Sequence, residues 1–386
     1  MRASIALISS GFAAFSALYC LQPILSSLAM SFQITPAKSS FALSISTITL
    51  SAGLVVTGLL SDWLGRKPIM AASMFAAGIL TIIGALIHNW TAFLVCRALL
   101  GLVLGGITAI NMTYLAEEVH PKHMGYAMGL MIEGNSIGGM LSRLVVGVAS
   151  EYVSWRYIVA MLGVLTTVAA VILWYLLPQS RHFTARPLSL SSVFSGFSLH
   201  LKNPLLRTLF VIGFLMMGSF VAFFNYVLFH LMEVPLNLSQ AAVGWLSLVY
   251  ILSTITSTKI GSLADRFGSD IVLLASVGVT LVGLLLTVTH ILFLVVLSIA
   301  TFTCGFFGAH STVSSWIGRS TRQARAQATA LYQIFFYLGA SVAGTLGGLF
   351  WQVGGWIGVC AMMSSMLLVS VGLAMLAKLT KPLSSS

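Results

Sequence analysis

The stretch GLLSDWLGRKP, residues 58–68, places one acid and two bases between two long apolar segments. A second stretch with the same frame, GSLADRFGSD, begins at Gly261. Asp62 and Asp265 are offset by 203 residues, and each lies four positions after one glycine and three before another. The chain has only eight Asp and Glu residues, so a carboxylate used twice in one pattern is unusual. The pattern predicts two related halves that share one structural corner.

The composition excludes an ordinary soluble protein. Of the 386 residues, 58% are hydrophobic and 7% are charged, and the mean hydropathy is +1.01. Soluble domains carry about 25% charged residues. Apolar stretches of about 20 residues, the length that crosses a bilayer core, follow one another along the chain. We therefore predict an all-α membrane protein.

Turn signals between the apolar stretches predict twelve membrane-spanning helices in two parallel repeats of six. The first six cover roughly 5–30, 40–60, 68–88, 91–117, 124–150 and 154–177. The second six cover roughly 205–232, 240–263, 271–290, 292–317, 326–352 and 355–377. The chain is thereby divided into an N-terminal half (1–178), a polar and basic cytoplasmic linker (179–203) in which a short amphipathic helix fits, and a C-terminal half (204–386).

The formal net charge of +11 has a topological origin. Lys and Arg gather in alternate loops, and the intervening loops hold only Lys38 and Arg156. This asymmetry follows the positive-inside rule, so we expect a multi-pass protein of the inner (plasma) membrane with both termini in the cytoplasm. Because the bases are distributed by side of the membrane, they do not indicate nucleic-acid binding.

The sequence also lacks the signals of several other functions. The four cysteines lie in apolar runs, so we expect free packing thiols rather than disulfides. We find no Cys/His spacing typical of a metal site and no glycine-rich phosphate loop with a lysine. We expect no cofactor, no metal and no enzymatic active site, and active transport would have to draw on an ion gradient.

Three motifs of the first half resemble those of the major facilitator superfamily. Residues 58–67 are similar to its motif A, G-x-L-[SA]-D-R-x-G-R-[KR], with Trp63 where Arg is usual. Arg97 begins RALLGLVLGG, which resembles motif B. GNSIGGMLSR, residues 134–143, resembles the antiporter motif G-x-x-x-G-P-x-x-G-G, with glycine in place of the proline and Ser-Arg in place of the last glycine pair.

At closer range the chain resembles the YnfM-like inner-membrane transporters, in the drug and metabolite:proton antiporter branch of that superfamily. LYCLQPIL, LSISTITLSAGLVVTGLLSD and GFFGAHSTVSSWIG are among the matching stretches, and the resemblance covers nearly the whole chain. It implies the twelve-helix fold, a monomer and proton-driven export. Parallel repeats of this kind place a substrate site near the membrane midplane between the halves.

The repeated frame suits a gate at the cytoplasmic face. Small residues at Gly58 and Gly65 would let helix ends approach closely. Asp62 can accept hydrogen bonds from the N-terminus of a neighbouring helix, and Arg66 and Lys67 can pair with acids. The alternative for the two bases is an ordinary solvated loop. We assign gating to Gly58, Asp62, Gly65, Arg66, Lys67 and Asp265, with Asp62 as the working latch and Asp265 as its weaker twin.

Charged residues within the predicted spans are candidates for proton coupling. Glu133 lies near the middle of the fifth span and is the candidate proton carrier, with a structural hydrogen bond or an anchor for a cationic substrate as alternatives. Arg97 and Arg143 are expected to belong to the same pathway, or else to extend toward the membrane interface. Glu117 and Glu118, at the cytoplasmic end of the fourth span, are expected to pair with the motif A bases.

Polar and aromatic side chains concentrate on the first, fourth, seventh and tenth spans, with others on the eleventh. His310 can titrate near neutral pH, although a helix–helix hydrogen bond is the alternative for a lone histidine. Packing is likewise the alternative for each tyrosine and amide. The candidate substrate-binding residues are Tyr19, Gln22, Asn111, Asn225, Tyr226, His230, His310, Tyr332, Gln333 and Tyr337.

The favoured function is a secondary active transporter that exports a small organic compound, a drug or a metabolite such as a sugar, against proton entry. The alternative keeps the fold but imports a sugar or an organic anion as a proton symporter or a uniporter, with an intramembrane arginine pairing with the anion. A membrane receptor without transport ranks behind both. The expected partners are a small-molecule substrate, protons and membrane lipid.

Overall fold

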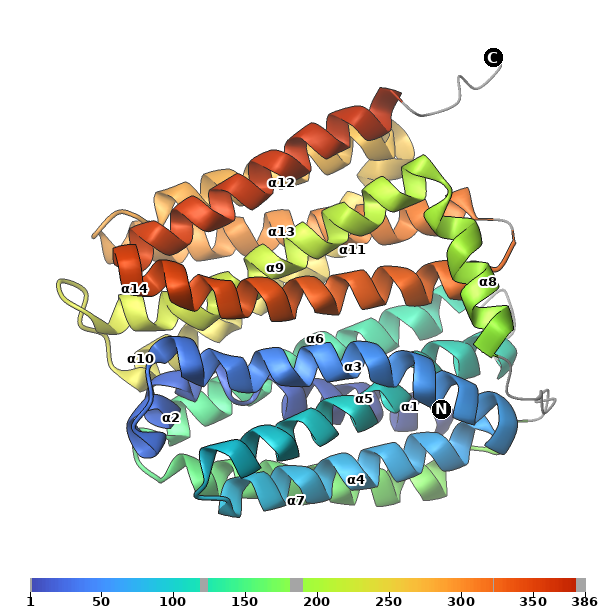
Figure 1. Cartoon of the computed structure of the whole chain (residues 1–386), viewed down its shortest axis with the longest axis horizontal. Coiled ribbons are helices and arrows are strands. Elements are labelled where there is room, and N and C mark those ends of the chain that lie inside the picture. The colour runs from blue at the N-terminus through green and yellow to red at the C-terminus, as the bar shows by residue number, and fades with distance from the viewer. Residues whose placement is uncertain (1, 119–123, 181–189, 322, 380–386) are drawn as a thin grey trace. The chain divides into compact units, whose positions relative to one another are not determined.

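The computed structural model describes residues 2–118, 124–180, 190–321 and 323–379. Within these ranges the side chains of some helical residues lie outside the description, Glu133 and Asp265 among them. The described chain is helical almost throughout (Figure 1). It divides into two compact units, each of which holds most of one predicted half.

Unit 1 comprises Met1–Ser189 and Asn237–Leu248. Its long helices run antiparallel to their neighbours in the chain (Figure 1). Its elements are α1 (Arg2–Tyr19), η1 (Gln22–Ile24), α2 (Leu25–Phe32), α3 (Pro36–Leu64), α4 (Arg66–Leu86), α5 (Trp90–Glu118), α6 (Met124–Ala149), α7 (Trp155–Leu176) and α10 (Gln240–Trp245).

Unit 2 comprises Leu190–Leu236 and Val249–Ser386. The 3-10 helix η3 (Leu246–Tyr250) carries the chain across the boundary between the units. The other elements are α8 (Leu190–Leu201), α9 (Pro204–Met232), α11 (Ile251–Phe267), α12 (Ser269–Leu286), α13 (Leu292–Ser320) and α14 (Arg325–Leu379).

These elements form the twelve predicted spans. α10, η3 and α11 make one span, and α14 contains two, because its backbone leaves helical angles at Gly354 and Gly355. Among the described residues, nine helices are long and apolar enough to cross a membrane, with α14 counted once. The all-α fold of two six-helix repeats is confirmed. The first span differs from the continuous helix that was expected, because residues 20–24 break it between α1 and α2.

Two turns with similar backbone angles lie 203 residues apart, the same offset as that between Asp62 and Asp265. Gly65 joins α3 to α4 with φ 100° and ψ 159°, and Gly268 joins α11 to α12 with φ 93° and ψ 142°. Such angles favour glycine, because a side chain there strains the backbone. At the other end of α3, Thr35 accepts a hydrogen bond from the first turn of the helix, and Ser239, 204 residues later, does the same for α10. The repeat therefore extends to turn and cap geometry.

The short helix α10 packs against α6 within unit 1. A Cβ on Gly147 would lie 2.7 Å from the Cα of Gly244, so the two helices meet backbone to backbone. Glu151 accepts a hydrogen bond of 2.7 Å from an N–H of the first turn of α10. Gln240 donates to the carbonyl of Pro23 at 3.1 Å. α6 begins at the end of unit 1 that holds Gly65, and Gly147 lies near its other end. This contact and Gly65 are therefore at opposite ends of unit 1.

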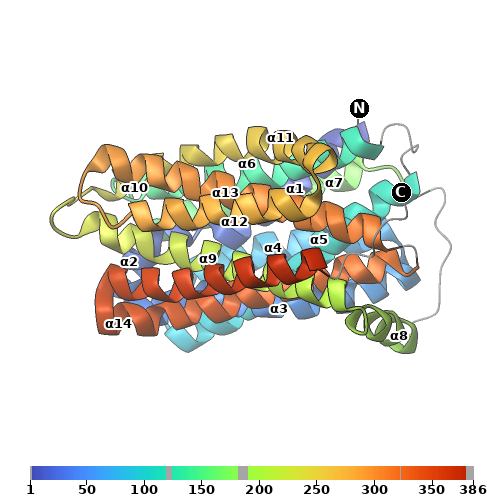
Figure 2. The same ribbon diagram turned by 90° about the horizontal axis from the view of Figure 1, so that it is seen from above.

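The linker contains one helix. α8 lies across the ends of α9 and α14 in unit 2, as the two views in Figures 1 and 2 show. The ring Nε2 of His200 is 2.9 Å from the carbonyl oxygen of Ala324, and Gly196 packs against the side chain of Gln327. These contacts fix the start of unit 2.

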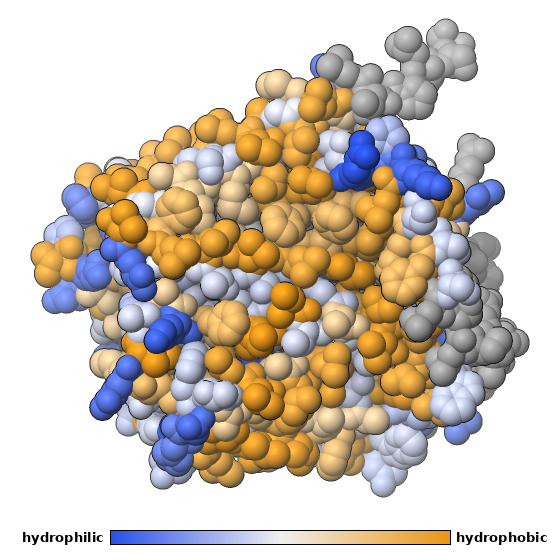
Figure 3. All heavy atoms as spheres, viewed as in Figure 1, coloured by the Kyte–Doolittle hydropathy of each residue, from blue (hydrophilic) through white to orange (hydrophobic). Residues whose placement is uncertain are grey.

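The outer surface is apolar along the helices. On the face in Figure 3, hydrophobic side chains cover the helix lengths and hydrophilic ones gather near the helix ends. Phe75, Leu165 and Leu285 are each about half exposed. Such a surface would promote aggregation in water, whereas a bilayer core is its natural solvent.

We expect Gly65→Ala to lower the thermal unfolding midpoint of the detergent-solubilised protein, because alanine would have to adopt the φ of 100° at a cost of about 1–3 kcal/mol. Gly278→Ala, in the middle of α12, is the matched control, because a Cβ there meets no described atom within 4 Å. Tryptophan fluorescence on heating measures both midpoints. Equal midpoints for the two variants would contradict the strain assigned to this turn.

Candidate functional site

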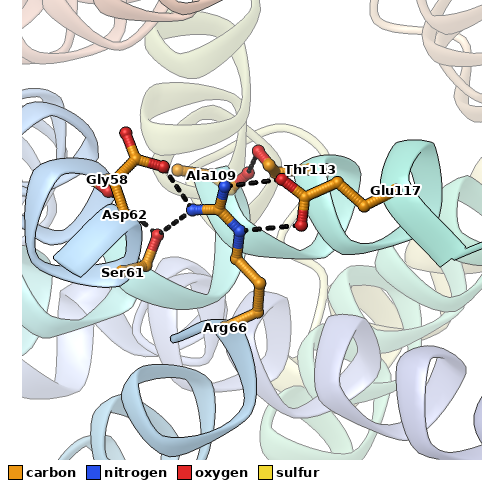
Figure 4. A network of polar contacts seen from close by, with 7 residues as sticks. All are labelled: Gly58, Ser61, Asp62, Arg66, Ala109, Thr113 and Glu117. Atoms are coloured by element: carbon orange, nitrogen blue, oxygen red, sulfur yellow. Dashed lines mark hydrogen bonds and ion pairs between the residues drawn. The ribbon is translucent and has the colours of Figure 1, made fainter. Parts of the chain in front are cut away.

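An ion cluster around a buried arginine joins three helices of unit 1 (Figure 4). Arg66, the first residue of α4, is 7% exposed. Its Nη2 and Nε donate to the two carboxylate oxygens of Glu117 in α5 at 2.6 and 3.0 Å. Its Nη1 donates to Asp62 at 2.5 Å and to Ser61 Oγ at 2.7 Å, both in the last turn of α3. The planar fork of donors lets one guanidinium bind both carboxylates.

The local sequence places the members of this cluster. Gly65 ends α3 and starts α4 within one residue, so Arg66 follows Asp62 by four positions and reaches back to it. As expected from the sequence, Glu117 is an acid partner of motif A. The side chain of Asp62 is 41% exposed and that of Glu117 is 27% exposed. Asp62 is thus the carboxylate more open to a change of partner.

The rest of the predicted gating set is less tightly bound. Lys67 Nζ lies 5.2 Å from the ring centre of Trp174, a cation–π contact. The expected close helix approach at Gly58 is wrong for this conformation, because a Cβ there would meet no described atom within 4 Å. Gly65 is needed for its backbone angle instead. The side chain of Asp265 lies outside the described part of the chain, so its role stays a prediction.

Unit 2 has a polar contact at the matching corner, with the base on a different helix. Ser269 occupies the position 203 residues after Arg66. Its Oγ accepts a hydrogen bond of 2.6 Å from Arg319 Nη2. Arg319 lies at the end of α13, beside the position that corresponds to Glu117 of α5. The two corners therefore share a backbone turn but differ in which helix carries the base.

Arg97 of α5 holds the break in the first span. The last carbonyls of a helix have no partner within it, and α1 ends at Tyr19. Arg97 donates to the carbonyls of Ala17 at 3.1 Å and Leu18 at 2.9 Å. Its Nε reaches the carbonyl of Ala42 in α3 at 3.4 Å. The cation also suits the negative end of the α1 dipole, so Arg97 positions the residues of the break.

The break brings three predicted residues together beside α6. Arg143, 4% exposed, donates through Nε to Gln22 Oε1 at 2.6 Å. Its Nη1 donates to the carbonyl of Gly139 at 2.7 Å. The guanidinium carbon lies 4.5 Å from the ring centre of Tyr19. A permanent cation, an amide and a phenol thus share one buried site.

Two other candidates of unit 1 lie on the neighbouring helices. Asn111 of α5 donates to Ser10 Oγ of α1 at 2.9 Å. Glu133 precedes Arg143 by ten residues on α6, which is about 15 Å along a helix. The side chain of Glu133 lies outside the described residues, so its proton-carrying role remains a prediction.

The interior of unit 2 contains stacked aromatic rings. His310 Nδ1 and Tyr332 Oη are 2.8 Å apart and join α13 to α14. The His310 ring is parallel to Phe306 within 4°, with centres 6.1 Å apart. Phe306 stacks in turn on Phe220 of α9 at 3.9 Å. This stack surrounds one polar pair with flat, mostly apolar rings.

The remaining candidates of unit 2 make interhelical contacts or are buried. Tyr226 donates to a backbone carbonyl of α14 at 2.9 Å. His230 stacks on Trp356 with ring centres 5.2 Å apart. Of the others, Asn225 and Tyr337 are buried and Gln333 is half-buried. Tyr337 joins the ring stack through Phe336, whose ring centre lies 5.6 Å from that of Tyr337 and 4.7 Å from that of His310.

Comparison with known proteins decides the family. The sequence profile of the Major Facilitator Superfamily matches residues 7–235 and 220–386. The chain belongs to the Major Facilitator Superfamily. It is 47% identical over 371 residues to the inner membrane transport protein YnfM of Escherichia coli (strain K12), a match that covers 96% of this chain and 89% of that protein.

Two further comparisons agree with this assignment. The chain is 41% identical over 373 residues to the uncharacterized MFS-type transporter YybF of Bacillus subtilis (strain 168), covering 97% of this chain and 92% of that protein. The crystal structure of the nucleoside transporter NupG has the same fold, with a TM-score of 0.76 and 17% identity over 98% of this chain and 99% of that one. This superfamily member is thus a multi-pass membrane transporter and not an enzyme.

Sequence reasoning missed part of the site of this transporter. It did not foresee Ser61 as a ligand of Arg66, although a hydroxyl one position before the acid could have suggested it. It also missed the ring stack around His310, because each phenylalanine taken alone suggests only a buried packing residue. The role of Arg97 as a cap for α1 required knowledge of the helix break.

We expect Arg97→Met to lower the unfolding midpoint of this transporter by about 1–3 kcal/mol in stability, because the Leu18 carbonyl loses its donor and the Ala17 carbonyl keeps only the Cys20 thiol. Arg207→Met, an exposed position of α9, is the matched control. Thermal unfolding in one detergent compares the two variants. Equal stability of both variants would refute the capping role.

Proposed function

We propose that this transporter is a monomer that exports a small organic compound in exchange for protons, by alternating access, with both termini in the cytoplasm. The Arg66 cluster carries the proposal, because a buried cation shared by two carboxylates can be rearranged between conformations. The YnfM-like motifs support proton-driven export among the modes of transport found in the superfamily.

The Arg66 cluster has the properties of a latch. Arg66 is buried while both carboxylates reach solvent, so opening the cluster leaves a buried cation that needs a replacement acceptor. Asp62 is the more exposed carboxylate, whereas Glu117 binds through both oxygens. Asp62 can therefore exchange Arg66 for another donor while Glu117 holds the guanidinium. Such an exchange gives the two states of comparable free energy that alternating access requires.

Glu133 is the proposed proton carrier. It is an acid near the middle of a predicted span, where a carboxyl group can exchange protons with whichever side water reaches. Arg143 follows it on α6, so a proton and an anionic or polar cargo would use the same helix. His310 is the second candidate for this role, because it pairs with Tyr332 in the interior of unit 2.

Arg143 also favours a second candidate function, the import of an organic anion with protons. A buried guanidinium beside an amide and a phenol can pair with an anionic cargo whichever way that cargo moves. Import and export then differ only in the direction in which the proton gradient drives the cargo.

Transport by the purified protein in liposomes tests proton coupling and direction together. The probes are labelled xylose, nicotinate and tetraphenylphosphonium, which are neutral, anionic and cationic. We expect an acidic interior to accelerate the uptake of at least one probe over that into protein-free liposomes, because departing protons drive an exchanger inward. Glu133→Gln should abolish the acceleration, and Glu233→Gln, at the exposed end of α9, should preserve it.

Acceleration by an acidic exterior instead would replace the export proposal with the import candidate. Uptake that is indifferent to the pH gradient, or an unchanged gradient effect in Glu133→Gln, would contradict proton coupling through Glu133.

A double-mutant cycle tests the latch. We expect Arg66→Gln and Glu117→Gln each to slow transport by about 10–100-fold, and the double variant to be no slower than either, because both remove the same interaction. Arg207→Gln, at an exposed position of α9, is the matched control and should have a small effect. Initial rates in liposomes measure all four variants, and additive losses would contradict a shared role.

A further inference from the structure

The site around Arg143 is preorganised by the crossing of α1 and α6. A Cβ on Gly138 would overlap the carbonyl oxygen of Phe12, so the two backbones touch. Ser16 Oγ of α1 donates to the carbonyl of Gly138 at 3.0 Å. Helices packed this closely hold the side chains at their contact at fixed separations. Arg143, one turn and a half beyond Gly138, therefore meets the end of α1 in a defined position.

Arg143 brings a permanent positive charge into the interior of unit 1. A guanidinium stays protonated in proteins, and its donors match a carboxylate in a bidentate geometry. Gln22 Oε1 lies 2.6 Å from Nε and marks a position where an acceptor oxygen binds this cation. The amide of Gln22 is neutral, so an anionic oxygen at such a position would gain more from the charge.

Tyr19 supplies an independent sign of a ligand. Its side chain is 3% exposed, and its hydroxyl oxygen is buried with no hydrogen-bond partner among the described residues. A buried hydroxyl left without a partner costs about 1–3 kcal/mol, so it is rarely retained without a role. The ring that carries it lies under the Arg143 guanidinium, 4.5 Å from the ring centre to the guanidinium carbon. Within the described part of the chain, a donor without an acceptor thus lies next to a cation.

We propose that Arg143, Tyr19 and Gln22 bind the anionic group of the cargo, and that this transporter carries small organic anions, carboxylates in the first place. The inference rests on the proposed function only in that the bound anion is also the transported compound. One carboxylate oxygen accepts from Arg143 and the other from the Tyr19 hydroxyl, while the Gln22 amide turns to donate. Arg97 acts as a positioning residue, because it holds the end of α1 on which Tyr19 lies.

The site is closed in this conformation, since Arg143 and Tyr19 are both buried. A cargo enters when the transporter opens to one side of the membrane, as alternating access provides. Glu133 lies about 15 Å from Arg143 along α6, so proton and anion would occupy separate places on one helix.

Binding to the purified protein in detergent tests the inference without any pH gradient. The ligands are two matched pairs, nicotinate with nicotinamide and benzoate with benzamide, each pair differing in a carboxylate against a neutral amide, with lactate and succinate as further carboxylates. The thermal unfolding midpoint and the displacement of labelled nicotinate report binding. We expect carboxylates to bind and the matched amides to bind at least about tenfold more weakly, because they lack the charge that pairs with a guanidinium.

Three variants locate the effect. Tyr19→Phe keeps the ring and removes only the hydroxyl, and should weaken carboxylate binding by about tenfold. Arg143→Lys keeps the charge but loses the planar fork and should weaken it by at least as much. Arg207→Gln, at an exposed position of α9, should bind like the parent protein. Tyr19→Phe keeps the test decisive even if a change of Arg143 prevents folding.

Equal binding of the amides, unchanged affinity in both Tyr19→Phe and Arg143→Lys, or no binding of any of these carboxylates at millimolar concentration would overturn the inference. Carboxylate binding without any gradient-driven transport would instead leave this site in place and refute the proton exchange proposed above.

Discussion

Inside a membrane a guanidinium keeps its charge and finds no bulk water, so acceptors of the same chain have to surround it. Three arginines of unit 1 meet this constraint, each with a different kind of acceptor. Arg66 binds two carboxylates at one end of the helices, Arg97 binds backbone carbonyls at the break in the first span, and Arg143 binds an amide and a carbonyl in the interior. These contacts join α1, α3, α4, α5 and α6.

The kind of acceptor decides what each arginine can do. Backbone carbonyls cannot leave or take up a proton, so Arg97 is a fixed support for the α1 end. Carboxylates on separate helices can change partners, which makes the Arg66 cluster suited to conformational exchange. An amide can turn aside for a stronger acceptor, which makes the Arg143 site suited to a ligand. One electrostatic constraint, met in three ways, thus supports the fold and underlies the gating and the cargo recognition that we propose.

The sequence predicted the architecture well because each signal was local and strong. Long apolar runs located the spans. The offset between Asp62 and Asp265 revealed a sequence repeat, and the backbone angles at Gly65 and Gly268 match at the same offset. Contacts between distant segments were harder to predict. The break after Tyr19 depends on Arg97, which lies in another helix. No described atom lies close to a Cβ placed on Gly58, because α3 crosses α5 elsewhere, at Gly53 and Gly105. The functional roles of Glu133 and Asp265 remain predictions.

The most direct test of the account asks whether the Arg66 cluster opens during transport. Ser61 is 1% exposed beneath Arg66, so a thiol from Ser61→Cys, in a protein whose four cysteines are replaced by serine, reports on this opening. The measurement is its rate of labelling by a water-soluble maleimide in liposomes, with and without an imposed pH gradient and a transported probe. The account predicts slow labelling at rest and markedly faster labelling during transport. Transport that proceeds while the thiol stays equally protected would contradict it.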